Sequence, residues 1–272
     1  MNDFLNSHAL QEYVVSLRRE LHQHPELSMQ EDWTCGRICE ELSALGIPYE
    51  LAGEKNVIGR IAFGPGKKLA IRADFDALPV QETVDVPWKS TQENVMHACG
   101  HDGHTAVLLG TARALLSMKN QLHGTVYLCF QQGEEAGQGA DKCVEYLKAH
   151  GGVDMAIGAH LLSILDTGAI DVGPGLRANG AGIFYIDITG KGGHGSRPDL
   201  VSNVLTIACD IYQHLIAIPS NRLEAARTCV VSPCAIQAGQ RYNVLPETAR
   251  LEGTFRFSGD GDGKILMDMI QD

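Results

Sequence analysis

The sequence has no apolar run long enough to cross a membrane, and it is short of positive charge. Its 272 residues include 22 Lys and Arg against 33 Asp and Glu, which gives a formal net charge of -11. Nucleic acids and anionic membrane surfaces are bound by clustered basic side chains, so this balance argues against both as partners. We therefore expect a small-molecule substrate or ligand.

Signals for secretion and for disulfide chemistry are also missing. Residues 1–16 lack the basic start and apolar core of a signal peptide. The eight cysteines show no dense, regular spacing, and none forms a Cys-x-x-Cys pair, which argues against a disulfide framework and against a thiol-redox protein. These absences predict a protein of the cytoplasm.

The apolar fraction of 44% is that of a globular protein with a sizeable core. Helical patterns cover residues 10–21, 30–45, 105–118 and 140–149, and strand patterns cover residues 57–63, 69–72, 125–130 and 155–158. Strands that alternate with helices in this way predict an α/β domain, in which helices flank a mixed, mostly parallel sheet.

The character of the sequence changes near Gly173-Pro174-Gly175. The later part has strand patterns at residues 182–189, 228–237 and 248–257, with helical patterns at residues 201–218 and 263–270. We expect two domains, a catalytic domain at residues 1–176 and a smaller α+β domain at residues 177–272. Because the last helical pattern reaches the C-terminus without a stop signal, we expect the second domain to be incomplete there.

Acidic residues and a histidine follow three of the predicted strands. Asp74 and Asp76 follow the strand at residues 69–72, Glu134 and Glu135 follow the next, and His160 follows the strand at residues 155–158. Any one of them alone would be read as a solvated loop residue. Sites of open parallel sheets form beyond the carboxyl ends of the strands, so three such ends together predict a site.

The strongest single motif is the eight-residue stretch from His97 to His104, which contains three His, one Cys and one Asp. Cys99 and His101 can reach one metal ion from a tight turn, and a thiolate ligand favours zinc or another transition metal. The alternative, a buried cysteine beside helix-capping residues, fits this density of ligand-type side chains less well. A structural zinc knuckle is disfavoured because a second Cys pair is missing.

Two further motifs have weaker signals. In Glu134-Glu135, one carboxylate can coordinate a metal while its neighbour stays free as a general base. His194 lies in the glycine-rich loop from Gly190 to Gly195, where the backbone is free to approach a ligand. That loop lacks the Lys-Ser/Thr ending of a phosphate loop.

As a set, these motifs resemble the dinuclear-metal aminoacylase and carboxypeptidase family, in the branch that holds hippurate hydrolase, N-acyl-amino-acid amidohydrolases, N-acetyldiaminopimelate deacetylase and plant auxin-conjugate hydrolases. The resemblance runs over nearly the whole chain. It rests on His22 to Leu27, Arg72 to Pro79, Cys99 with His101, Glu134-Glu135, Gly158 to His160, Gly190 to Pro198, Asn243 to Pro246 and Gly253 to Arg256.

The resemblance implies a catalytic domain with an inserted lid that also forms a homodimer interface. It implies two divalent metal ions, such as Zn or Mn, and hydrolysis of the amide bond of N-acyl amino acids or peptide-like small molecules. By the resemblance, the residues take the following roles: Cys99, His101, Glu135 and His160 as metal ligands, Glu134 as general base, Asp76 as an acid that orients a ligand, His194 as a donor to the oxyanion in the partner subunit's site, and Asn243 and Arg256 as substrate-carboxylate contacts.

Two departures from the family pattern bear on these expectations. After His160 the usual Pro-containing segment is replaced by Leu161-Leu162-Ser163. The family's last metal ligand, a histidine of the C-terminal stretch that returns from the lid, has no counterpart in these 272 residues. The alternative interpretation is therefore a catalytically inactive fragment, or a dimerisation or binding module without that ligand.

Overall fold

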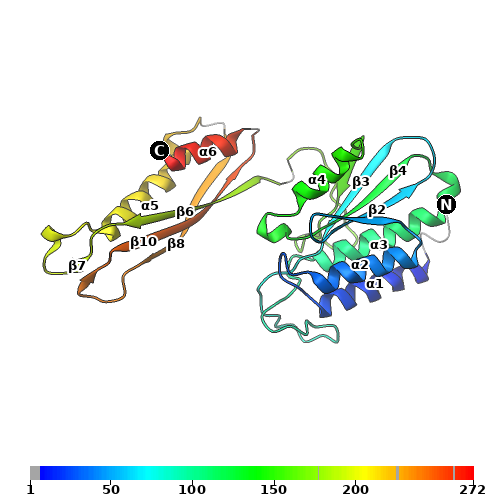
Figure 1. Cartoon of the computed structure of the whole chain (residues 1–272), viewed down its shortest axis with the longest axis horizontal. Coiled ribbons are helices and arrows are strands. Elements are labelled where there is room, and N and C mark those ends of the chain that lie inside the picture. The colour runs from blue at the N-terminus through cyan, green and yellow to red at the C-terminus, as the bar shows by residue number, and fades with distance from the viewer. Residues whose placement is uncertain (1–6, 177, 225–226, 260) are drawn as a thin grey trace. The chain divides into compact units, whose positions relative to one another are not determined.

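The structure is a computed structural model that describes residues 7–176, 178–224, 227–259 and 261–272. The chain falls into two compact units, Met1–Ala169 and Ile170–Asp272, and Figure 1 shows both in cartoon form. Each unit has its own sheet and its own hydrophobic core. No helix among the described residues is long and apolar enough to cross a membrane.

The first unit is built on a five-stranded sheet in the order β1-β2-β4-β3-β5. Its strands are β1 (Tyr49–Ala52), β2 (Asn56–Ala62), β3 (Lys68–Asp74), β4 (Thr125–Gln131) and β5 (Met155–Gly158). β3 pairs in parallel with β4 and β5, while β2 runs antiparallel to both β1 and β4. Four of the five strands therefore point the same way, which confirms the expected mixed, mostly parallel sheet.

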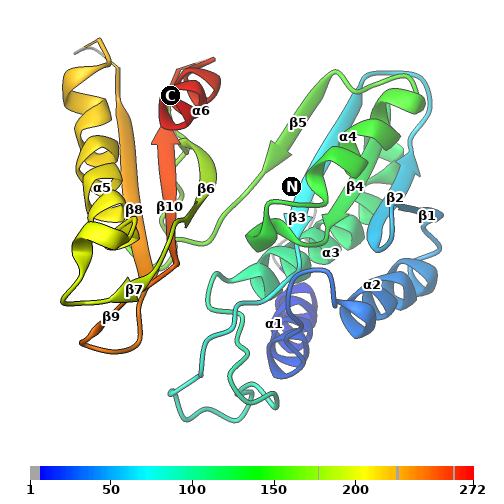
Figure 2. The same cartoon turned by 60° about the vertical axis from the view of Figure 1, so that its left-hand side comes forward.

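Helices cover both faces of this sheet. α1 (His8–Gln23), α2 (Asp32–Ala44) and α3 (His101–Ser117) lie on one face, and α4 (Ala140–Ala149) lies on the other, as Figure 2 shows. The core between the first three helices and the sheet includes Leu21, Ile38, Leu128 and Phe130, each at most 1% exposed. Burying one such side chain contributes about 1.5–3 kcal/mol, so this core sets the position of α3 on the sheet.

The start of α3 is fastened to the end of β3. Gly100, with φ 84°, provides the left-handed residue before the helix, and the hydroxyl of Thr105 donates a hydrogen bond to the Asp74 carbonyl at 2.9 Å. The first turn of α3 buries His101 and His104 rather than apolar side chains. The polar first turn of this helix therefore faces the carboxyl end of β3.

The second unit is a three-stranded antiparallel sheet in the order β6-β10-β8, with α5 (Val204–Asn221) and α6 (Asp262–Gln271) packed against it. The strands are β6 (Gly180–Thr189), β8 (Cys229–Ala238) and β10 (Thr248–Phe257). Val204, Leu251 and Leu266 are fully buried where the helices meet the sheet. A two-stranded ribbon, β7 (Gly193–His194) with β9 (Val244–Leu245), extends the unit.

The sequence patterns locate most of these elements. The bounds of β5, α4 and β10 agree with the predicted ranges. The patterns miss β1, β7 and β9, which have only two to four residues each. They also start α3 at residue 105 instead of His101, because the buried polar residues of its first turn break the apolar period.

Candidate metal centre

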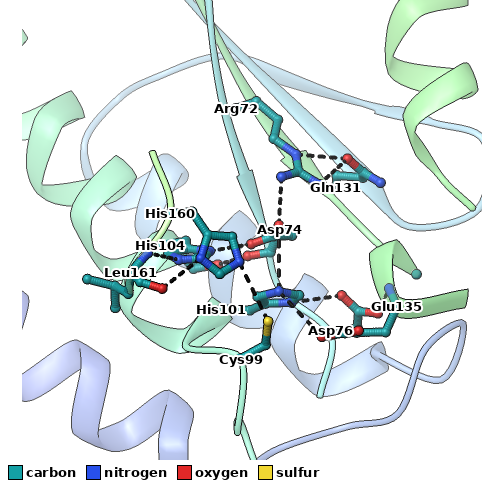
Figure 3. Close-up of polar contacts among 12 residues, drawn as sticks. Arg72, Asp74, Asp76, Cys99, His101, His104, Gln131, Glu135, His160 and Leu161 are labelled. Carbon is teal, nitrogen blue, oxygen red and sulfur yellow. Dashed lines mark hydrogen bonds and ion pairs between the residues drawn. The ribbon is translucent and has the colours of Figure 1, made fainter. Parts of the chain in front are cut away.

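The carboxyl ends of β3, β4 and β5 and the start of α3 bring the candidate ligands together (Figure 3). Among the described residues there are three groups of three side chains, and within each group the ligand-type atoms lie within 4.8 Å of one another. His101 belongs to all three. The groups are Cys99 with His101 and His160, His101 with Glu134 and Glu135, and Asp74 with His101 and His104.

His101 offers a buried ring nitrogen to which no other described residue forms a hydrogen bond. Its Nδ1 lies 3.0 Å from Oδ1 of Asp76, and because a carboxylate only accepts, Nδ1 carries the proton. Among the described residues Nε2 has no hydrogen-bond partner, and it lies 3.7 Å from Oδ2 of Asp74 and 3.8 Å from Oε1 of Glu135. A buried unpaired acceptor costs about 1–3 kcal/mol, so this nitrogen fits a position that binds a cation.

Cys99 and His160 face each other next to His101. The Cys99 Sγ lies 3.5 Å from Nε2 of His160, while Nδ1 of His160 donates to the Leu161 carbonyl at 2.7 Å. Burial, followed by the hydrogen bond with Glu135 and its charge, raises the pKa of the Cys99 thiol to about 12. A thiolate at this place therefore requires a nearby cation, which is what a transition-metal site provides.

Asp74 lies next to His101 and His104 as an ionised carboxylate. Burial alone would raise its pKa, but the hydrogen bond from His104 and the charges of His101 and Arg72 lower the pKa of Asp74 to about 2. Nη1 of Arg72 lies 2.7 Å from Oδ2 of Asp74. Asp74 is therefore ionised at neutral pH.

The acid pair lies in a short 3-10 turn, Glu134–Ala136, between two left-handed glycines. Gly133 and Gly137 have φ values of 64° and 67°, which residues other than glycine rarely adopt. The backbone N–H of Glu135 donates to Oδ2 of Asp76 at 2.9 Å. Asp76 therefore fixes two of the predicted ligands, His101 through its ring and Glu135 through its backbone.

Glu134, the first residue of the acid pair, is half-buried. Burial, and next the charges of Asp74 and Glu135, raise the pKa of Glu134. Its carboxylate belongs to the same 4.8 Å group as His101 and Glu135. It is thus close enough to exchange a proton with a molecule held at the centre.

Three residues that no sequence motif marks form hydrogen bonds with the acid-pair turn or with Asp76. The carboxylate of Glu31 accepts from the Gly133 N–H at 2.7 Å, and Oδ1 of Asn56 accepts from the Gln132 N–H at 2.9 Å. Ser28 donates to Oδ2 of Asp76 at 2.7 Å. No sequence signal marks these three contacts, because the partners are 48 to 102 positions apart.

The second unit holds the three remaining predicted site residues, and it does not bring them together within one chain. His194 is the last residue of β7 and Asn243 comes directly before β9, and the two are neighbours because the Gly195 N–H donates to the Asn243 carbonyl at 2.9 Å. Arg256 lies eight residues beyond Thr248, the first residue of β10, which is roughly 27 Å at the rise of an antiparallel strand. The ribbon precedes that first residue, so Arg256 is at the far end of the sheet.

Comparison with known proteins agrees with this arrangement. The profile of the family described as Peptidase family M20/M25/M40 matches residues 70–259, which is more than half of the chain. The match to this family profile agrees with the fold and with the clustered ligand-type residues. The chain belongs to the M20/M25/M40 peptidase family.

Individual relatives support the same assignment. The chain is 38% identical over 245 residues to an N-acyl-L-amino acid amidohydrolase of Geobacillus stearothermophilus, covering 89% of this chain and 66% of that protein. It is 39% identical over 249 residues to the N-acetylcysteine deacetylase of Bacillus subtilis, covering 89% and 64%. The chain therefore spans about two thirds of the length of these curated relatives.

A solved structure shows the same fold. The Bacillus subtilis YXEP protein, described as a dinuclear metal binding peptidase from the M20 family, is 34% identical and superposes with a TM-score of 0.76. That match covers 97% of this chain and 69% of the other. A member of the same family with this fold is thus described as binding two metals.

Proposed function

We propose that this chain supplies the catalytic centre of a metal-dependent amidohydrolase. The substrates would be N-acyl amino acids or related small conjugates, and the products a carboxylate and a free amino acid. The observation that carries the proposal is the convergence of Cys99, His101, His160 and the Glu134-Glu135 pair at one edge of the sheet. The names of the relatives above, an amidohydrolase and a deacetylase of N-acyl compounds, support the reaction class.

The donor set suits two divalent ions. Cys99, His101, Glu135 and His160 would hold Zn, Mn or a similar transition metal, since thiolate and imidazole favour these over Mg or Ca. Such ions would polarise the substrate carbonyl and lower the pKa of the attacking water. The unpaired Nε2 of His101 is the structural feature that fits this role.

The side chains of the protein would carry the proton transfers. Glu134 takes a proton from the attacking water and later delivers it to the leaving amine. Asp76 keeps the Nε2 of His101 and the backbone of Glu135 in place during both steps. These two carboxylates thus have separate duties, one in proton transfer and one in orientation.

His194 would stabilise the oxyanion that forms when water attacks the amide carbon. Its Nδ1 accepts from the Ser196 N–H at 3.2 Å, so in the neutral ring the proton lies on Nε2, which is free to donate. Asn243 and Arg256 would bind the substrate carboxylate. Because His194 and Arg256 lie at opposite ends of the second unit, we propose a homodimer in which two copies share these duties.

Replacement of the base tests the proposal directly. Glu134→Gln should lower turnover of hippurate and N-acetyl amino acids by roughly 10²- to 10⁴-fold while the metal content stays the same. Glu145→Gln on the exposed face of α4 is the matched control and should leave turnover unchanged. Wild-type rates in Glu134→Gln would overturn the role of Glu134.

The same assay separates the enzyme from the alternative of a binding or dimerisation module. Bound metal together with turnover supports the enzyme, and a protein that binds no metal and turns over neither substrate class supports the module. We also propose that the protein works in the cytoplasm, which the scattered spacing of its cysteines supports.

A further inference from the structure

His104 has both ring nitrogens bonded to groups that are not among the proposed metal ligands, the Asp74 carboxylate and a backbone N–H. Its Nδ1 lies 2.5 Å from Oδ1 of Asp74, and its Nε2 lies 2.9 Å from the backbone N of Leu161. A backbone N–H can only donate, so Nε2 must be the acceptor and the proton must lie on Nδ1, where it bonds Asp74. Neither nitrogen of His104 is then left to bind a metal, although the residue sits in one of the three ligand-type groups.

The residue that His104 holds is the neighbour of a proposed ligand. The Leu161 carbonyl accepts the Nδ1 proton of His160 at 2.7 Å, which leaves Nε2 of His160 facing Cys99 at 3.5 Å. Figure 3 shows this series from Asp74 through His104 and Leu161 to His160. The backbone of Leu161 thus donates a hydrogen bond to His104 through its N–H and accepts one from His160 through its carbonyl.

Packing alone would hold this segment weakly. Leu161 is 55% exposed, and a cavity of about 160 Å³ lies against Leu161, His104 and His160. His160 comes two residues after the last residue of β5, Gly158, so the sheet no longer fixes its backbone. The Leu161 side chain does lie on Gly103, where an added Cβ would come within 2.5 Å of it.

We propose that His104 is a positioning residue, which with Asp74 fixes Leu161 and thereby aims Nε2 of His160 at the metal centre. The inference rests on the proposed function only in treating His160 as a ligand. With both of its ring nitrogens bonded, His104 acts on His160 through the Leu161 N–H and through an edge-on ring contact with His160, whose centroid lies 4.6 Å away. Partners of this kind behind a metal ligand typically change metal affinity by about 10- to 100-fold.

The first test reads the tautomer directly in the wild-type protein. Nitrogen-15 NMR of histidine side chains should show His104 as a neutral ring with its proton on Nδ1 and a bare Nε2. A protonated Nε2 or a charged ring would overturn the proposal, because the Leu161 N–H would then have no acceptor. This measurement needs no substrate and no variant.

The second test measures metal binding in variants. Titration with Co²⁺ reports on Cys99 through the thiolate-to-cobalt absorption band. We expect His104→Phe to weaken one of the two Co²⁺ binding steps by about 10- to 100-fold, and His104→Gln, whose side-chain carbonyl can accept from Leu161, to recover most of it. His150→Phe, on the surface at the end of α4, is the control and should bind Co²⁺ as the wild type does.

The outcomes separate this inference from the proposed function. Two unweakened Co²⁺ steps in a folded His104→Phe protein would overturn it, whatever the enzymatic activity. If that variant does not fold, the tautomer read in the wild-type protein still decides the proposal, because a protonated Nε2 would refute it. A protein with the expected cobalt behaviour but no amide turnover would refute the proposed reaction alone.

Discussion

Oδ1 of Asp76 lies 3.0 Å from Nδ1 of His101, and this contact decides which ring nitrogen faces the candidate metal centre. The second oxygen of Asp76 accepts from Ser28 and from the backbone of Glu135. One buried carboxylate therefore accepts three hydrogen bonds and joins β3, α3 and the acid-pair turn. Its replacement should affect metal binding before it affects the fold.

We predict that Asp76→Asn lowers metal affinity by about 10- to 100-fold. The amide that replaces one carboxylate oxygen is a donor, so at least one of the three donors from His101, Ser28 and Glu135 loses its acceptor. Competition with a metal chelator measures the effect. Asp166→Asn, an exposed change in the loop after β5, is the control. Equal affinities in wild type and Asp76→Asn would contradict the orienting role.

A second prediction concerns the thiolate. Cys99→Ser should abolish the thiolate-to-cobalt absorption band and weaken metal binding, because a serine hydroxyl stays protonated and is a harder ligand. The exposed Cys209 provides the matched change, and Cys209→Ser should keep the band. Persistence of the band in Cys99→Ser would show that another cysteine binds the metal.

Asn56 should be important for stability although it touches no proposed ligand. The side chain is fully buried and makes three hydrogen bonds, accepting from the Gln132 N–H and donating to the carbonyls of Ala52 and Gly139. Asn56→Ala leaves these buried groups unpaired, and we expect it to lower the free energy of unfolding by about 2–4 kcal/mol. Chemical denaturation measures this, with the exposed Asn120→Ala expected to change it by less than about 0.5 kcal/mol. A loss in Asn56→Ala as small as that of the control would refute the bracing role.

A pH-dependent contribution to stability should come from His22. Its Nδ1 lies 2.7 Å from Oδ2 of Asp102, and this hydrogen bond, together with the charge of Asp102 and the hydrogen bond with Glu82, outweighs burial and raises the pKa of His22 above its usual 6.5. A raised folded-state pKa stabilises the fold fully below pH 6.5, and this stabilisation is lost as the pH rises through the raised value.

The comparison with His22→Gln isolates this effect. The difference in unfolding free energy between wild type and His22→Gln should be largest below pH 6.5 and should shrink at higher pH. Denaturation curves recorded at a series of pH values measure it. A difference that grows with pH would mean that His22 is held as a neutral ring.

The sequence predicts the parts of this fold that depend on local patterns. The alternation of apolar residues locates β10, and the helical period locates α4, with the observed bounds in both cases. The position of Cys99, His101, Glu135 and His160 after strands or in a tight turn also suffices to predict one shared edge. Topology, rather than any single motif, makes that prediction work.

Contacts between distant positions are beyond such patterns. The bond from His104 to Asp74 spans 30 positions, and the one from Leu161 to His104 spans 57. The spacing of His101 and His104 by three residues does place both on one helix face, which could have indicated a shared neighbour. Which nitrogen each ring presents depends on the folded surroundings, and no linear pattern encodes it.

The length of β10 has a consequence for genetics as well as for chemistry. A small substrate cannot touch His194 and Arg256 of the same second unit, because they lie at opposite ends of one sheet. If both serve one reaction, an inactive protein altered at His194 and another altered at Arg256 should complement each other when mixed. In a dimer that contains one copy of each variant, one centre would then contain both native side chains and the other centre would contain neither.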